Sequence, residues 1–364
     1  MRLLYITNGI TGSGGLERVL SIKASLLAEN YKYHVHILSL NEARRNPFFS
    51  ISTKVTLHSI NVSGNPISYI KSYIKGIQSI INIVEPDIIL VCDDGLKGFF
   101  LPRLLKTKAR WIYERHVSKL IAIRSHHGLI RNYLAKIQWF LMEKLGKGFS
   151  RFVVLTETNK KEWMALPNVI VIPNPLPFYP ASSSSLNNKQ VICVGKISFQ
   201  KGQDLLVSAW KSVLKDFPEW TLQLYGKSNE SFLNTKDLTI QNINYFEAEK
   251  NIMHNYLESS IYVMSSRFEG FGMVLIEAMA CGVPCISFDC NHGPSDIITH
   301  GEDGILVEQN NVKKLAESIK ILMNDEFLRK EMGKKAKQNV LRYSPHVIIE
   351  VWDELFKSLL IENK

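Results

Sequence analysis

The sequence lacks any long apolar run. No stretch of eighteen or more uncharged apolar residues occurs in the 364 residues, which excludes a membrane-spanning helix. The opening residues, MRLLYITNGITGSGG, turn from a short apolar run to a glycine-rich polar segment. This pattern predicts a β-strand and a loop rather than a signal peptide, so we expect a cytoplasmic protein.

Cysteine is also scarce. The five cysteines are an odd number and include no C-x-x-C pair. Cys281, Cys285 and Cys290 are near one another, but the nearest histidine, His292, does not complete a standard zinc spacing. We therefore expect buried thiols in a reducing compartment and no metal site.

Apolar runs of strand length alternate with amphipathic segments of helix length along the whole chain. This order predicts parallel sheets with helical crossovers, an α/β fold, and 364 residues favour two domains. The segment PNPLPFYPASSSSLNNK (173–189) is rich in proline and then in serine, as expected of a connector. We predict two doubly wound domains, with the boundary between residues 173 and 174 and ligands bound at the carboxyl ends of the strands, in an interdomain cleft.

The charge is uneven. Residues 1–170 hold 24 basic and 11 acidic residues, whereas the rest of the chain holds 20 and 23. Residues 97–151 alone hold 13 basic and 2 acidic residues, which predicts an anionic partner. A nucleic acid is one candidate, but no RNP, KH or zinc-finger pattern is present.

An anionic membrane surface is the second candidate for the stretch 97–151. The segment 128–151 is amphipathic, and Trp139, Phe140 and Leu141 are expected to insert at the interface beside flanking lysines. The alternative is a helix packed on the core with a solvated basic face.

Two glycine-containing loops follow predicted strands. GSGGLER (12–18) could bring backbone amides to a phosphate at a helix start, but it matches neither G-x-G-x-x-G nor a P-loop, and a plain turn is the alternative. In VGKISFQKG (194–202), Lys196 and Lys201 are placed to contact phosphate oxygens or to stabilise a leaving diphosphate. Solvated surface lysines are the alternative there.

Two glutamates flank a helix start in FEGFGMVLIEAMACGVP (268–284). Gly270 and Gly272 permit close backbone approach, and the helix that follows directs its positive end toward an anion. Glu269 and Glu277 would repel phosphate, so we expect them to accept hydrogen bonds from sugar or ribose hydroxyls. Glu277 lies between apolar residues, where an unpaired carboxylate is costly to bury.

This last segment resembles the E-x7-E signature of retaining glycosyltransferases of family 4, which have the GT-B fold. GGLERVL (14–20), VGKISFQKG, IPNP (172–175) and GPSDII (293–298) followed by GILV occur in the order of that family. The resemblance spans nearly the whole chain. It implies an N-terminal acceptor-binding domain, 1–173 plus a C-terminal helix in 345–364 that crosses back to it, and a donor-binding domain, 174–344.

The resemblance also implies roles for single residues. Lys196 and Lys201 would contact the diphosphate, although the family usually has arginine at position 196. Glu269 would meet the donor sugar and Glu277 the ribose, beside Gly270, Phe271 and Gly272. The loop at Gly14 and Gly15 would close on the donor, and His116 in ERH would lie near the donor sugar.

The reaction implied is transfer of a hexose or N-acetylhexosamine, with retention by front-face displacement, from a nucleotide sugar, most simply a UDP-sugar. No metal is expected, and Asp93 and Asp94 in CDDG are interpreted as acceptor-side or capping residues. The acceptor would be a glycan linked to undecaprenyl diphosphate, used for polysaccharide, O-antigen or glycoprotein glycan, at the inner face of the plasma membrane. We expect a monomer. A GDP-mannose-dependent enzyme, another GT-B enzyme and a nucleic-acid-binding protein are the alternatives.

Overall fold

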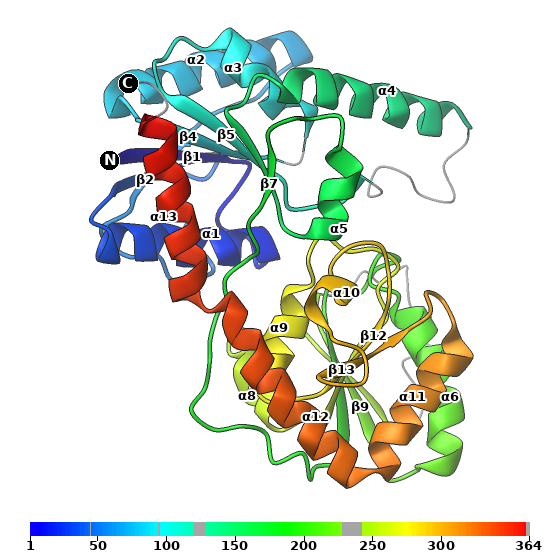
Figure 1. Ribbon diagram of the computed structural model, residues 1–364. Coiled ribbons are helices and arrows are strands. Elements are labelled where there is room, and N and C mark those ends of the chain that lie inside the picture. The colour runs from blue at the N-terminus through cyan, green and yellow to red at the C-terminus, as the bar shows by residue number, and fades with distance from the viewer. Residues whose placement is uncertain (44, 94, 120–128, 228–241, 362–364) are drawn as a thin grey trace. The chain divides into compact units, whose positions relative to one another are not determined.

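The computed structural model describes residues 1–43, 45–93, 95–119, 129–227 and 242–361, with side chains of 129–132 left out. The chain divides into two compact units (Figure 1). Unit 1 comprises Met1–Pro175 and Pro345–Lys364, and unit 2 comprises Leu176–Ser344. The boundary expected from the sequence, 173/174, differs from this division by two residues.

Unit 1 is built on a seven-stranded sheet with the order β3-β2-β1-β4-β5-β6-β7, all pairs parallel. Its strands are β1 (Arg2–Thr7), β2 (His34–Leu40), β3 (Thr56–Ile60), β4 (Ile88–Cys92), β5 (Arg110–Glu114), β6 (Arg151–Val154) and β7 (Val169–Val171). Its helices are α1 (Gly15–Asn30), α2 (Pro66–Val84), η1 (Leu96–Phe100), α3 (Leu101–Leu104), α4 (Leu129–Gly146), α5 (Glu157–Lys160), η3 (Lys161–Trp163) and α13 (Pro345–Ile361).

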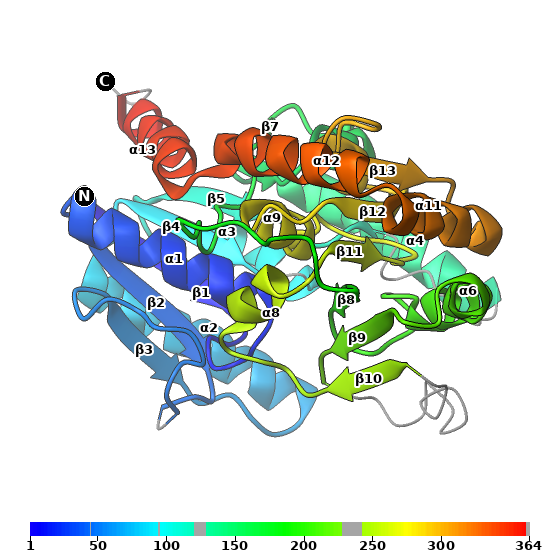
Figure 2. The ribbon, with the colours of Figure 1, turned by 90° about the horizontal axis from the view of Figure 1, so that it is seen from below.

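Helices cover both faces of this sheet because successive strand residues point to opposite sides. Leu3 and Tyr5 of β1 join a core with α1 and α13, whereas Leu4 and Ile6 join a second core with α2, η1 and α4. The C-terminal helix α13 lies beside α1 in both views (Figures 1 and 2). The last helix of the chain is therefore part of the first unit, as the resemblance implied.

Unit 2 is built on a six-stranded parallel sheet with the order β10-β9-β8-β11-β12-β13 (Figure 2). Its strands are β8 (Gln190–Val194), β9 (Thr221–Tyr225), β10 (Ile243–Phe246), β11 (Ile261–Met264), β12 (Cys285–Phe288) and β13 (Gly304–Val307). Its helices are α6 (Gln203–Asp216), α8 (Ile252–Leu257), α9 (Met273–Ala280), α10 (Pro294–Ile297), α11 (Val312–Asn324), α12 (Glu326–Asn339) and η4 (Val340–Tyr343).

Both sheets reverse their strand order once. The reversal falls between β1 and β4 in unit 1 and between β8 and β11 in unit 2. Such a switch point leaves the loops after its two strands side by side at the carboxyl edge, where doubly wound folds bind ligands. The two predicted Rossmann-like sheets are confirmed, and they place the motif loops 195–202 and 265–272 at one switch point.

Candidate active site

Lys201 and Glu269 meet at the switch point of unit 2. The loop after β8 carries Lys201 and the loop after β11 carries Glu269, and the Lys201 Nζ lies 2.6 Å from Glu269 Oε1. Ser266 Oγ donates a second hydrogen bond to the same oxygen, also at 2.6 Å. Glu269 is 6% exposed, and a carboxylate buried to this degree needs such partners. Two residues that the sequence singled out separately thus form one ion pair.

Arg267 fastens these two loops to each other. Its guanidinium donates to both carboxylate oxygens of Asp204, at 2.9 and 2.6 Å, and to the Phe199 carbonyl at 2.8 Å. It also lies over the Phe199 ring, 4.2 Å from the centroid. The backbone adds a bond from the Arg267 N–H to the Gln200 carbonyl at 2.8 Å. Sequence reasoning missed Arg267, because nothing local indicates that its partners lie in a loop more than sixty residues earlier.

Glycine is required where the loops come closest. Gly202 has a φ of +64°, and a Cβ there would lie 2.1 Å from the Ser265 carbonyl oxygen. Gly293, which opens GPSDII, has a φ of +102°, and its Cβ would lie 2.0 Å from the Phe271 carbonyl oxygen. These glycines let the loops that carry Lys201 and the Gly270–Gly272 segment pack tightly against their neighbours.

Helix α9 begins directly after this segment. Gly272, with a φ of +100°, is its N-cap, and Phe271 before it is buried with its ring edge-on to Tyr343. Gly270 is half-buried. The first amides of α9 have no acceptor within the helix, so this end can bind an anion.

Glu277 lies inside α9 and is 3% exposed. The Tyr256 hydroxyl of α8 donates to its Oε2 at 3.2 Å. Glu277 is therefore buried and has a polar partner, so it is not a surface residue of the helix. Its expected contact with a ribose stays a prediction.

Lys196 differs from Lys201. The Lys196 side chain is exposed. Within the described ranges it forms no ion pair, and its carbonyl accepts bonds from Ser198 and Gln203. The structure therefore brings Lys201, but not Lys196, into contact with Glu269.

Gly14 and Gly15 lie in unit 1, exposed at the start of α1, where Gly14 is the extended N-cap. The loop before them is anchored by Glu42, which accepts from the Ile10 N–H at 2.8 Å and from the Thr11 N–H at 3.3 Å and its hydroxyl at 2.5 Å. Burial alone would raise the pKa of Glu42, but these hydrogen bonds hold it below its ordinary value. The loop is thus fixed to β2 through an ionised carboxylate.

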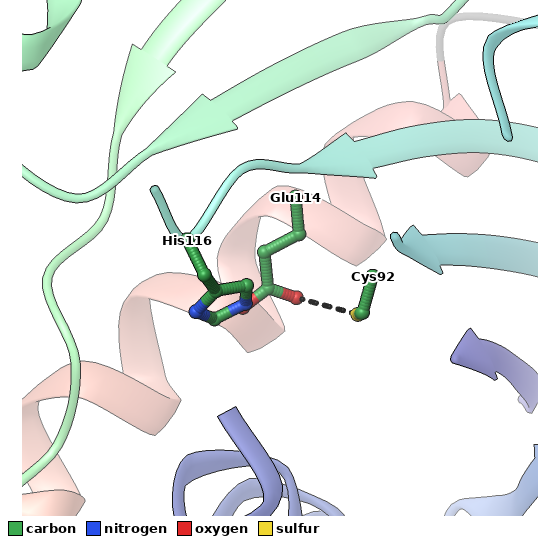
Figure 3. Close-up of side chains that lie close together, drawn as sticks. All are labelled: Cys92, Glu114 and His116. Atoms are coloured by element: carbon green, nitrogen blue, oxygen red, sulfur yellow. Dashed lines mark hydrogen bonds and ion pairs between the residues drawn. The ribbon is translucent and has the colours of Figure 1, made fainter. Parts of the chain in front are cut away.

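His116 belongs to a buried polar cluster in unit 1. Its Nε2 lies 3.2 Å from Glu114 Oε1, and the Cys92 thiol donates to Glu114 Oε2 at 3.4 Å (Figure 3). Cys92, Glu114 and His116 are residue types that bind metals, and their ligand atoms lie within 4.8 Å of one another. However, Lys23 Nζ is 2.5 Å from both Glu114 oxygens. An ammonium held there would repel a metal ion, so the cluster does not fit one.

Asp93 follows β4 and is 2% exposed. Its Oδ1 accepts from Asn8 Nδ2 at 3.0 Å and from the Gly95 N–H at 2.7 Å. This carboxylate caps a turn, in agreement with one of the two readings of CDDG. Asp94 lies outside the described residues.

Helix α4 presents a surface of apolar and basic side chains. Tyr133, Leu134, Ile137 and Phe140 are 66%, 57%, 40% and 64% exposed, and Lys136, Lys144 and Lys147 are exposed beside them. Trp139, however, packs against the core of unit 1, and Leu141 is half-buried. Trp139 is therefore turned toward the core, whereas Phe140 is available at the surface, and the expected insertion into a membrane stays a prediction. Residues 120–128 of the basic stretch lie outside the described residues.

No helix in the described ranges is long and apolar enough to cross a bilayer. All five cysteines are buried free thiols. Burial, partly opposed by Lys337, raises the pKa of Cys281 to about 12. The cysteines thus occupy core positions, as expected from the sequence.

A family model and two full-length relatives show that this chain is similar to glycosyltransferases. The family model "Glycosyl transferases group 1" matches residues 179–339. The amylovoran biosynthesis glycosyltransferase AmsD of Erwinia amylovora is 30% identical over 97% of this chain and 99% of its own length. An uncharacterized glycosyltransferase of Haemophilus influenzae is 29% identical over 96% of this chain and 97% of its own.

A solved structure has the same fold. A mutant of S. aureus TarM in complex with fondaparinux, α-GlcNAc-glycerol and UDP superposes with a TM-score of 0.80 over 98% of this chain and 99% of its own. At 14% identity this similarity supports the GT-B fold alone.

Proposed function

Because the chain belongs to the glycosyl transferases group 1, we propose that it transfers a hexose or N-acetylhexosamine from a UDP-sugar to a hydroxyl group of a glycan, with retention of configuration. The observation that carries the proposal is the Lys201–Glu269 pair at the carboxyl edge of the unit 2 sheet. It offers a cation for phosphate and a carboxylate for sugar hydroxyls at one switch point.

Lys201 and the start of α9 would bind the diphosphate. An ammonium has three N–H donors, so a contact with Glu269 leaves two for phosphate oxygens. The free amides of α9 after Gly272 add positive potential, and the exposed Lys196 would add charge. These groups would balance the charge on the departing UDP, so we propose that no metal is needed.

Glu269 would accept hydrogen bonds from the donor sugar and Glu277 from the ribose. The bond from the anomeric carbon to the diphosphate oxygen breaks, and a bond to the acceptor oxygen forms on the same face. The acceptor proton passes to the departing phosphate oxygen, so the sugar keeps its anomeric configuration. The roles expected of Gly14 and Gly15 at the phosphate and of His116 at the sugar stay predictions.

A screen of nucleotides tests the donor. A ligand that binds only the folded protein raises its melting temperature by mass action. UDP and UDP-sugars should protect wild type, and protection should shrink in Lys201→Met. Protection by GDP and GDP-mannose instead would favour a mannosyltransferase.

For the acceptor, we propose a glycan linked to a lipid diphosphate at the inner face of a bacterial plasma membrane, in polysaccharide biosynthesis. Relatives named for amylovoran and for undecaprenol-linked N-acetylgalactosamine transfer support the class. The α4 surface supports the location, because exposed aromatic and aliphatic side chains between lysines suit an anionic interface.

Flotation with liposomes tests the location. Binding should require anionic lipid and fall as salt rises. Changing Lys136, Lys144 and Lys147 to glutamate should abolish it, whereas the same change at Lys313, Lys334 and Lys335, three exposed lysines of unit 2, should not. Equal loss in both triple variants would show an effect of net charge only and would contradict an α4 surface.

A further inference from the structure

A second polar site lies at the switch point of unit 1. Thr7 of β1 pairs with Cys92 of β4, so the residues that follow them, Asn8 and Asp93, stand side by side at the carboxyl edge of the sheet. Asn8 Nδ2 donates to Asp93 Oδ1 at 3.0 Å, and the Gly95 N–H donates to the same oxygen at 2.7 Å. One oxygen of this carboxylate is therefore satisfied within unit 1.

The other oxygen of Asp93 is buried, and no hydrogen bond from a described residue reaches it. Its ion-pair partner, Lys97 Nζ, lies 3.7 Å from Oδ2, which is beyond hydrogen-bonding length. A buried acceptor in this state costs free energy. An asparagine would cap the same turn through one oxygen without burying a charge. The second carboxylate oxygen is therefore explained better by a ligand than by the turn.

A cation and two aromatic rings lie next to this oxygen. Lys97, half-buried on η1, donates from Nζ to the Tyr69 hydroxyl at 3.2 Å and lies 5.1 Å from the centroid of the Tyr73 ring. Tyr69 and Tyr73 are one turn apart on α2, and their rings are stacked with 17° between the planes. Burial, and then the charge of Asp93, raise the pKa of Tyr73. The carboxylate, the ammonium and the stacked rings thus form one cluster.

The chemistry of this cluster suits a neutral sugar better than a phosphate or a metal ion. Asp93 would repel an anion and Lys97 a metal ion, whereas Oδ2 can accept a hydrogen bond from a hydroxyl group. After its bond to Tyr69, Lys97 still has N–H groups to donate to a sugar oxygen. The half-buried Tyr69 ring offers its exposed part to the apolar C–H groups on one face of a pyranose.

We propose that Asp93, Lys97 and Tyr69 form a binding site for one neutral pyranose residue of the acceptor glycan, held entirely by unit 1. Asp93 Oδ2 accepts from a sugar hydroxyl, Lys97 donates to a second sugar oxygen, and Tyr69 packs against the ring. The inference rests on the proposed function, because it takes the bound sugar to be part of the glycan that receives the donor sugar. It joins the two interpretations of Asp93, a cap through Oδ1 and an acceptor-side residue through Oδ2.

Binding can be measured without a nucleotide, so the test does not depend on transfer. Saturation-transfer NMR would use the full-length protein with the methyl α- and β-glycosides of glucose, galactose, N-acetylglucosamine and N-acetylgalactosamine as probes. Wild type should bind at least one probe, with the strongest saturation on the C–H protons of one ring face. No binding of any probe by wild type would overturn the inference.

Asp93→Asn is the sharpest variant. Its carbonyl can keep the bonds from Asn8 and Gly95, so the turn stays capped, but an NH2 group replaces the acceptor at Oδ2. Binding of the probe should weaken about 10- to 100-fold, as expected when a hydrogen bond to a charged group is lost. The melting temperature should change little, because the ion pair with the half-buried Lys97 is long. Unaltered binding would mean that the carboxylate only caps its turn, and the inference would be wrong.

Two control variants locate the bound probe. Lys75→Met changes an exposed lysine of α2 and should bind the probe as wild type does. Glu269→Gln changes the site in unit 2 and should also leave binding unaltered. If Glu269→Gln abolishes binding and Asp93→Asn does not, the probe occupies the donor site and the inference is wrong.

The inference and the proposed function can fail separately. In the transfer reaction, Asp93→Asn should raise the acceptor KM about 10- to 100-fold with little change in the donor KM. If transfer occurs and the acceptor KM of this variant equals that of wild type, the proposed function stands and the inference falls. If wild type binds a probe through Asp93 but transfers no sugar from any nucleotide sugar, the sugar site stands and the proposed function falls.

Discussion

Replacing Glu269 by glutamine should remove most turnover while leaving the fold intact. Glu269 Oε1 accepts from Lys201 Nζ and from Ser266 Oγ, both at 2.6 Å. No hydrogen bond from a described residue reaches Oε2, which the proposed function gives to the donor sugar. A glutamine would turn its carbonyl to Lys201 and Ser266, because an NH2 group there would face an ammonium.

That orientation presents an NH2 group, not an acceptor, to the sugar. Loss of one hydrogen bond that stabilises a transition state costs about 2–4 kcal/mol, and each 1.36 kcal/mol is a factor of ten. We therefore expect kcat to fall roughly 30- to 1000-fold. The free energy of unfolding should fall by only about 1 kcal/mol, because the glutamine carbonyl keeps both contacts.

The assay measures UDP release and denaturant unfolding for the same preparations. Glu331→Gln, at an exposed position of α12, is the control and should match wild type in both. A Glu269→Gln variant that turns over within threefold of wild type would refute the reasoning about Oε2. A variant that is unfolded under the assay conditions would contradict the expectation that the fold stays intact.

Three further changes test other contacts. Lys201→Met should weaken UDP binding about 10- to 100-fold in calorimetry, because a charge-assisted bond to phosphate contributes about 1.5–3 kcal/mol, whereas unaltered affinity would remove Lys201 from the diphosphate site. Arg267→Lys should lower kcat although it keeps the charge, because lysine cannot form the paired bonds to Asp204; a wild-type rate would show that the loops hold without this clamp. Wild type should lose stability as the pH falls from the ordinary pKa of a glutamate toward about 2, the pKa of Glu114 in the folded protein. A pKa that is lower in the folded state means that the ionised carboxylate stabilises the fold, and protonation removes that stabilisation. The Glu114→Gln variant should lose less stability than wild type over that range. Equal losses would mean that other carboxylates account for most of the destabilisation by acid.

The central strands could be predicted from the sequence because strands buried on both faces read as continuous apolar runs. β1, β4, β8 and β11 consist largely of such runs, and they fix both switch points. The edge strands β3 and β10 are not predicted, because half-exposed strands such as TLHSI mix polar and apolar residues and give no such run. Helix α12 was missed for the same reason, since most of its residues are charged or polar.

The candidate site could be predicted only in part. Motif order indicated Lys201 and Glu269, but their contact depends on the pairing of β8 with β11, which no local pattern states. Arg267 and Tyr256 act through partners distant in sequence, so they gave no signal. Lys23 does give a signal in the sequence, because it lies on the buried face of α1, where the helical period calls for an apolar residue.

The most direct test of the central claim follows the fate of a UDP-α-sugar given to the protein without an acceptor, in the presence of EDTA. Slow release of UDP is expected, and ¹H NMR should detect the free sugar first as the α-anomer, before mutarotation. Lys201→Met and Glu269→Gln should abolish both signals. First appearance of the β-anomer would contradict retention, and UDP release that requires added manganese would contradict the metal-free role proposed for Lys201 and the start of α9.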